Sequence, residues 1–270
     1  MLGAVTMSAQ FLKPFLPESN ATVTIGPAAQ IACPLNVEAG GVCMNGGTFG
    51  GKVSLLKTGA GNNTGNGNNV FSDSLSIVNN GTGYMVFSNS VRDIYNGVLS
   101  ATTNSSGIVY LAHRGTNTEF NENIIVSSTS NGSIRFGAST GTSSLATGKT
   151  FIVGTSGFNS GSLNLSRFTQ TGANPLSFTL GSGAILILGP ALVLNGDVSI
   201  NSEVYVLMER HLMEQFLLLK PEQQTMRVVG IMFIMLLLLL LIPEPAISCL
   251  RILPEMYLMM MLNLPVQDRD

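Results

Sequence analysis

The sequence predicts an all-β fold, a parallel β-solenoid (β-helix-like) built from stacked units of about 22–25 residues. Three observations predict it: an aromatic-apolar pattern that recurs at that spacing, turn-forming residues between the copies, and a longer repeat near the two ends of residues 21–207. A tandem antiparallel β-sandwich is the alternative, because Asn-Gly turns also close hairpins. We favour the solenoid because its turns suit this spacing.

The short repeat is an aromatic residue followed four and six positions later by apolar residues. Its copies begin at Phe49, Phe71, Tyr95 and Phe120, so successive copies start about 22–25 residues apart. Residues at i, i+4 and i+6 share one face of a strand, whereas a helix would scatter them. Each unit is therefore predicted to be a strand plus a turn. One such unit cannot bury its apolar side alone, so the units must stack. The solenoid model predicts that the four rings lie together along one wall.

Polar segments separate these strands. They are Asn79-Asn80-Gly81, Asn104–Gly107 and Ser130–Gly132. Asparagine and glycine tolerate positive φ, so we expect the chain to turn at these segments.

The long repeat aligns Gly26–Met44 with Gly189–Leu207 without a gap, at an offset of 163 in the numbering. Apolar positions coincide, for example Leu35 with Val198. After Leu207 the match stops, and the composition changes at the same point. Residues 1–207 hold 29 of the 30 glycines, while residues 208–270 hold 9 of the 13 methionines. We therefore divide the chain into a truncated or irregular N-terminus at 1–20, a β-repeat domain at 21–207, and a tail at 208–270.

The tail is interpreted as a frameshifted continuation of the repeat, disordered or forming a spurious apolar helix. When the tail is back-translated into codons and the codons are read one base out of frame, the resulting translation is rich in Asn and Gly. Its KTGA segment aligns with Lys57–Ala60. Asn-Gly codons read in that way give methionine followed by a residue such as glutamate, as at Met208-Glu209. Encoding DNA that translated only to unrelated peptide in the shifted frame would contradict this hypothesis.

Read literally, the tail contains a membrane segment at Val228–Ile242. That run has 15 residues, whereas about 20 are needed to cross a bilayer, and Pro243 ends it. A membrane-anchored protein is therefore expected only if this segment is genuine. Met1–Phe15 carries no legible secretory signal, so we expect the natural N-terminus to be missing.

Composition limits the partners. Only 10% of residues are charged and the formal net charge is −2, so the chain has no basic footprint and no nucleic-acid partner is expected. Stacked strands instead offer ladders of Asn, Ser and Thr that can bond water, glycans or neighbouring strands. Such faces suit weak multivalent contact with glycans or neighbouring surface proteins. The alternative is a solvated face with no ligand.

Several blocks of the sequence are typical of one repeat family. They are Asn45–Gly51, Lys57–Asn63, Val70–Tyr84 and Ala112–Ile124. With these blocks the chain, over about residues 21–207, resembles the very long repeat-built surface proteins of Bacteroidetes. The resemblance implies a secreted or outer-surface, adhesin-like bacterial protein. It implies no catalytic or binding residue.

One catalytic motif occurs, and its context does not support it. Gly137–Gly141 matches G-x-S-x-G around Ser139, a motif that needs a strand-turn-helix setting, and no helix is predicted there. His113 precedes the serine, whereas that fold places the histidine after it. We therefore expect no catalytic residue. The alternative is a polysaccharide-acting enzyme on a β-helix, which would gather at least two carboxylates beside Lys or Arg on one face.

No metal or cofactor site is expected. His113 and Arg114 stand alone, and one histidine makes no site. The candidate acids are isolated; they are Asp73, Asp93 and Asp197. Cys33 and Cys43 could close a small loop, yet they correspond to Gly196 and Val206 in the second copy. A bond that the second copy omits is not expected to hold the fold.

Overall fold

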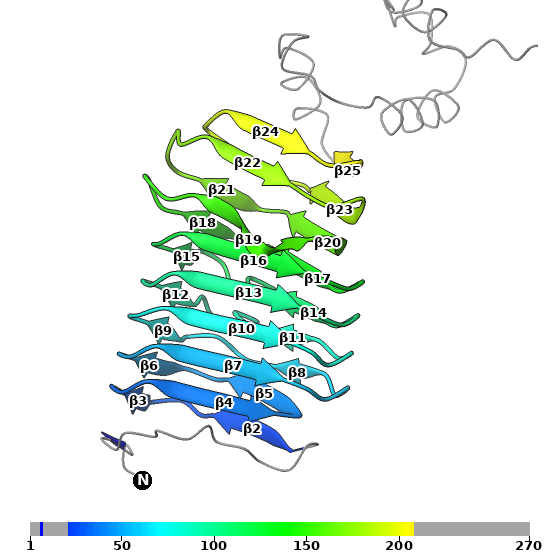
Figure 1. Cartoon of the computed structure of the whole chain (residues 1–270). Coiled ribbons are helices and arrows are strands. Elements are labelled where there is room, and N and C mark those ends of the chain that lie inside the picture. Colours follow the sequence, from blue (N-terminus) through cyan, green and yellow to red (C-terminus); the bar gives the residue numbers. More distant parts are fainter. Residues whose placement is uncertain (1–5, 8–20, 208–270) are drawn as a thin grey trace, which may run out of the picture. The chain divides into compact units, whose positions relative to one another are not determined.

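The computed structural model describes residues 6–7 and 21–207 (Figure 1). Every regular element of this part is a strand, and every strand pair is parallel. The strands stack as a β-solenoid whose longest wall contains eight strands. The predicted fold class is therefore confirmed, and parallel pairing rules out the antiparallel sandwich. The tail at 208–270, including Val228–Ile242, lies outside the described residues.

Three walls of stacked strands surround the core, and most turns contribute one strand to each wall (Figure 1). The first wall contains β1 (Thr6–Met7), β3 (Ala29–Ile31), β6 (Gly47–Phe49), β9 (Val70–Phe71), β12 (Ile94–Tyr95), β15 (Thr118–Phe120), β18 (Ser143–Leu145) and β21 (Phe168–Gln170). The second wall contains β4 (Leu35–Ala39), β7 (Val53–Lys57), β10 (Leu75–Asn79), β13 (Leu99–Thr103), β16 (Ile124–Ser128) and β19 (Phe151–Phe158).

The third wall is built in the same way. It contains β8 (Asn63–Thr64), β11 (Met85–Val86), β14 (Ile108–Tyr110), β17 (Ser133–Phe136), β20 (Ser160–Leu165), β23 (Gly183–Leu188) and β25 (Val204–Leu207). Two further pairs lie near the ends of the stack; they are β2 (Thr22–Ile25) with β5 (Gly41–Met44), and β22 (Leu176–Thr179) with β24 (Val198–Asn201). Thr6–Met7 pairs with β3, so this part of the segment expected to be irregular is a strand.

The core is a set of in-register columns of inward side chains. In the second wall Leu75 lies between Val53 and Leu99, and the strands alternate buried and half-buried residues. In the first wall the aromatic residues form a stack, with successive ring centroids 5.0, 5.3 and 4.9 Å apart and ring planes within 15°. Its members are Phe49, Phe71, Tyr95 and Phe120, each at most 1% exposed. The predicted aromatic ladder is confirmed.

The residues of one short repeat lie on two walls, whereas the prediction placed them on one strand. Phe49 ends β6, whereas Val53 and Leu55 belong to β7, on the next wall. The three residues therefore share no single strand. They are all buried, because the corner at residues 50–52 redirects the chain while the side chains continue to face the interior. Each unit has three strands rather than one.

The polar segments do form turns, between the second and third walls, but for a different reason. None of their residues has a positive φ. Their glycines are required by close packing, since a Cβ on Gly107 would collide with the carbonyl oxygen of Gly81 in the preceding turn. Positive φ occurs instead at the corner between the third and first walls. The non-glycine examples there are Asn68, Ser88, Asn117, Ser139, Arg167 and Ala191.

The long repeat corresponds to whole turns. The second wall runs from β4 through β7, β10, β13 and β16 to β19, and β22 and β24 continue it (Figure 1). β4 and β24 are thus seven steps apart, and an offset of 163 over seven steps gives about 23 residues per turn. Leu35 and Val198 each begin their strand. The part of the chain that the structure describes contains no helix long and apolar enough to cross a membrane.

Candidate binding surface

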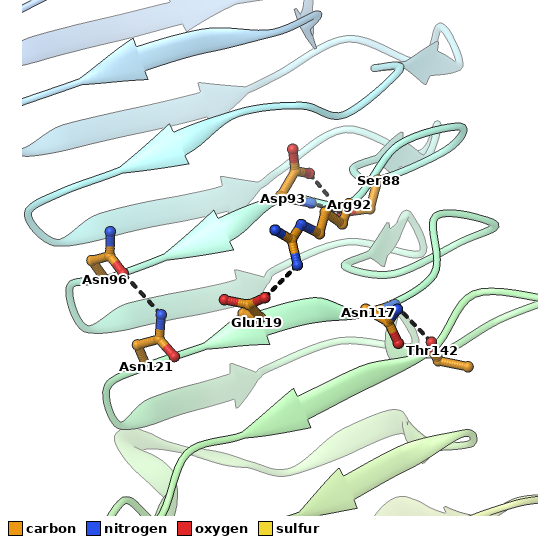
Figure 2. Close-up of polar contacts among 8 residues, drawn as sticks. All are labelled: Ser88, Arg92, Asp93, Asn96, Asn117, Glu119, Asn121 and Thr142. Atoms are coloured by element: carbon orange, nitrogen blue, oxygen red, sulfur yellow. Dashed lines mark hydrogen bonds and ion pairs between the residues drawn. The ribbon is translucent and has the colours of Figure 1, made fainter.

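The outward side chains form hydrogen-bonded ladders along the stack. At the corner between the first and second walls, the Nδ2 of Asn121 donates to the Oδ1 of Asn96 in the preceding turn at 2.8 Å (Figure 2). The two residues follow Phe120 and Tyr95, which are paired in register. In-register stacking is what brings two like side chains to hydrogen-bond distance.

A second ladder lies at the corner between the second and third walls. The Nδ2 of Asn104 donates to Asn80 at 3.0 Å, and the hydroxyl of Thr129 donates to Asn104 at 2.9 Å. A carboxamide has two N–H donors and two acceptor lone pairs, so each asparagine keeps hydrogen-bonding capacity after pairing. The expected polar ladders are therefore present, and their asparagines present further donors and acceptors outward in the turns that they join.

Two ion pairs join adjacent turns. Arg92 contacts Glu119 at 2.5 Å (Figure 2), and Lys149 contacts Glu122 at 2.5 Å. A hydrogen bond from Lys149 lowers the pKa of Glu122. Both pairs are solvent-accessible, so each contributes at most about 1 kcal/mol. Glu119 lies in β15 and Glu122 in the corner between β15 and β16, and each carboxylate has its own cation.

The most polar group inside the described solenoid is centred on Asp93. Its Oδ1 accepts hydrogen bonds from the backbone and the side-chain nitrogens of Asn69, each at 2.8 Å, and its Oδ2 accepts one from the Ser88 hydroxyl at 2.7 Å (Figure 2). Asn69 in turn accepts from the backbone nitrogens of Gly46 and Gly47. These bonds lock the corner between the third and first walls across three turns.

Burial raises the pKa of Asp93, while the hydrogen bonds from Ser88 and Asn69 oppose that rise. Burial and the nearby Asp93 charge raise the pKa of Tyr95 well above its ordinary value. The sequence shows Asp93 as an isolated acid, and this cluster was missed. The sequence does contain a signal for this cluster, because Asn69 and Asp93 each lie two positions before an aromatic residue of the ladder.

The structure does not join Ser139 to a catalytic histidine. Ser139 is exposed, with φ of 54°, between strands β17 and β18, so a strand follows it and not a helix. The backbone oxygen of His113 accepts a hydrogen bond from Gly141 at 3.1 Å, but its ring packs against Tyr110. Burial, and then the charge of Arg114, lowers the pKa of His113.

The remaining candidates lie apart. Among the described residues, no three His, Cys, Asp or Glu side chains come together as a metal site. Cys33 and Cys43 are not bonded to each other. Asp73 accepts a hydrogen bond from the backbone of Ser74 at 2.6 Å, and Asp197 is exposed.

Comparison with protein-family models, with characterised proteins and with solved structures gives no match. The class of the protein is therefore defined by its geometry, as a parallel β-solenoid with polar ladders on its outer corners.

Proposed function

We propose that the chain is a structural or adhesive repeat segment of a secreted bacterial cell-surface protein, and that it performs no catalysis. The observation that supports this most is the set of outward Asn and Thr ladders, which repeat from turn to turn at the corners. The resemblance of residues 21–207 to repeat-built surface proteins of Bacteroidetes supports the same function.

The ladders suit weak binding at several similar positions. Neighbouring strands lie about 4.8 Å apart, so paired residues of adjacent turns, such as Asn96 and Asn121, present like donors and acceptors at that interval. Modest sites that are held together in this way act at a high effective concentration. The partners proposed are glycans or neighbouring surface proteins, not nucleic acid.

Two alternatives have less support. An enzyme acting on polysaccharides would need paired carboxylates beside a cation on one face, whereas Glu119 and Glu122 each form an ion pair with a different cation. A membrane-anchored surface protein would depend on Val228–Ile242, which lies outside the described residues.

The proposal is tested by locating the protein on cells that carry the gene. Antibodies raised against residues 21–207 should label intact cells, and brief protease treatment of those cells should remove the label. An internal cytoplasmic protein, followed in parallel, should be unaffected. Labelling that appears only after the cells are lysed would contradict a surface location.

A further inference from the structure

The outer face of the third wall carries a cluster unlike the polar ladders, which we call the tyrosine-arginine patch. It consists of Tyr84, Tyr110, His113 and Arg135. The Tyr84 and Tyr110 rings meet edge to face with centroids 6.1 Å apart, and the His113 ring lies 4.9 Å from Tyr110. The guanidinium carbon of Arg135 lies 5.5 Å from the centre of the Tyr110 ring. All four residues are half-buried.

In-register stacking builds this patch. Tyr110 in β14 is paired with Arg135 in β17, and Arg135 is paired with Asn164 in β20. Tyr84 directly precedes β11, one turn before Tyr110. The patch therefore runs along the stack across three successive turns. It adjoins Asn164 of the next turn, whose Oδ1 accepts a hydrogen bond from Ser166.

The charge of Arg135 is not neutralised within the described residues. The third-wall strands contain no acidic residue, and Arg135 is their single charged residue. The ion pairs of the described part involve other cations, and the Nε of Arg135 is buried without a hydrogen-bond partner. The ring of Tyr110 holds the guanidinium by a cation-π contact, which supplies no hydrogen-bond acceptor.

These features match the chemistry of an acidic sugar. A pyranose presents C–H groups on its faces, which pack on aromatic rings, and hydroxyls at its rim, which bond phenol and carboxamide groups. A guanidinium binds a carboxylate through two parallel hydrogen bonds. Nucleic acid would instead require a track of several cations, and this wall has one.

We propose that the tyrosine-arginine patch binds an acidic glycan, with a uronate carboxylate on Arg135 and a sugar ring against Tyr110. The glycan chain runs along the solenoid axis, from Tyr84 toward Asn164. This inference rests on the proposed adhesive function and names the ligand class of one surface.

The test is a titration of the full chain with an oligogalacturonate and with the same oligomer after reduction of its carboxyl groups. The protein has no tryptophan and five tyrosines, two of them in the patch, so the change in tyrosine fluorescence that Tyr110→Phe removes is the part that reports on the patch. Wild-type protein should bind the acidic oligomer at least about tenfold more tightly than the reduced one, the change expected from losing one charge-assisted bidentate contact. Equal affinity for the two oligomers, or no binding of either, would overturn the proposal.

Two variants then locate the site. Arg135→Gln should weaken binding of the acidic oligomer about tenfold and remove the preference over the reduced oligomer. Arg92→Gln, which removes an arginine beside the first wall, is the matched control and should leave affinity unchanged. Equal losses in both variants would show a diffuse charge effect and contradict a site at Tyr110 and Arg135. Far-ultraviolet circular dichroism checks that each variant is folded.

Failure of this inference can be told apart from failure of the proposed function. A chain that labels intact cells but does not bind the acidic oligomer retains its surface role and loses only this ligand. A chain found only inside cells loses the surface role whatever it binds in solution.

Discussion

Asp93 is a buried carboxylate that has hydrogen-bond donors but no cation beside it. Asn69 and Ser88 supply three hydrogen bonds to its two oxygens, and its residue is fully buried. Donors of this kind stabilise the ionised form, whereas loss of hydration destabilises it. Because burial is the larger effect, the pKa of Asp93 rises above its ordinary value of 3.8.

This shift predicts an unusual pH dependence of stability. The folded chain holds the Asp93 proton more tightly than the unfolded chain does. Protonated Asp93 therefore adds to the free energy of unfolding. This stabilisation is complete below pH 3.8 and is lost as the pH rises through the folded-state pKa. Asp93→Asn keeps an acceptor toward Asn69 and cannot ionise. Urea unfolding over a pH series should therefore show the wild type losing stability relative to Asp93→Asn as the pH increases.

The contrary result would be a wild type that gains stability relative to Asp93→Asn with increasing pH. That would mean that the hydrogen bonds outweigh burial and that the folded state prefers the ionised carboxylate. Asp73→Asn is a suitable control, because it removes an acid from an outer corner, where Asp73 accepts a hydrogen bond from the backbone nitrogen of Ser74.

Single residues of this kind were only partly predictable. The aromatic rings were identified because they recur at a nearly constant spacing and are large and apolar. The Asn69–Asp93 pair also keeps that spacing, but its two members differ in residue type. Comparing the repeats of one chain identifies positions that keep the same residue type. A hydrogen bond joins a donor to an acceptor, which here belong to different residue types, so the comparison does not reveal it. The tyrosine-arginine patch was missed for the same reason.

The corners between the second and third walls depend on backbone contacts between turns. The glycines follow one another up the stack so closely that a Cβ on Gly81, Gly107 or Gly132 would collide with a carbonyl or hydroxyl oxygen of the turn before. In β7, β10, β13 and β16 the last inward residue then donates to a corner carbonyl; the bonds are Lys57 to Gly59, Asn79 to Gly83, Thr103 to Ser105 and Ser128 to Ser130.

These contacts predict that Gly107→Ala destabilises the chain. The added methyl group would displace backbone in two turns, at a cost of about 1–3 kcal/mol. Gly61→Ala is the matched control, since nothing lies within 4 Å of the methyl position and its φ is not positive. That variant should change the free energy of unfolding by less than about 1 kcal/mol, toward greater stability. Both are measured by chemical denaturation, and equal effects would contradict a packing role for the corner glycines.

At the scale of the element, the strands of the second wall were the predictable ones. They have five residues each in β7, β10, β13 and β16, which is enough to show alternation. Strands such as β9, β11 and β12 have two residues each, too few to show any period. The positive φ at Ser88 or Arg167 carries no sequence signal, because neither residue type favours that conformation. The tertiary stack imposes it.

Over the whole described solenoid, the two repeat lengths have one origin. The short repeat is one turn, and the offset of 163 is seven turns, since Gly26–Met44 and Gly189–Leu207 occupy the same part of the turn seven steps apart. A block of seven turns therefore begins again near residue 189. We propose that the next turn of this block is encoded in the shifted frame of residues 208–270, which agrees with the abrupt end of the match at Leu207.

In-register parallel stacking is the property on which the ladders, the patch and the seven-turn block all depend. Cross-linking tests it, with the three native cysteines replaced by serine. Asn96→Cys with Asn121→Cys places two thiols in register in adjacent turns, about 4.8 Å apart at the backbone, within reach of a disulfide. Asn96→Cys with Ala146→Cys separates them by two turns, beyond that reach. Mild oxidation should bond the first pair and not the second. Bonding of both pairs equally, or of the second alone, would contradict the stacked solenoid.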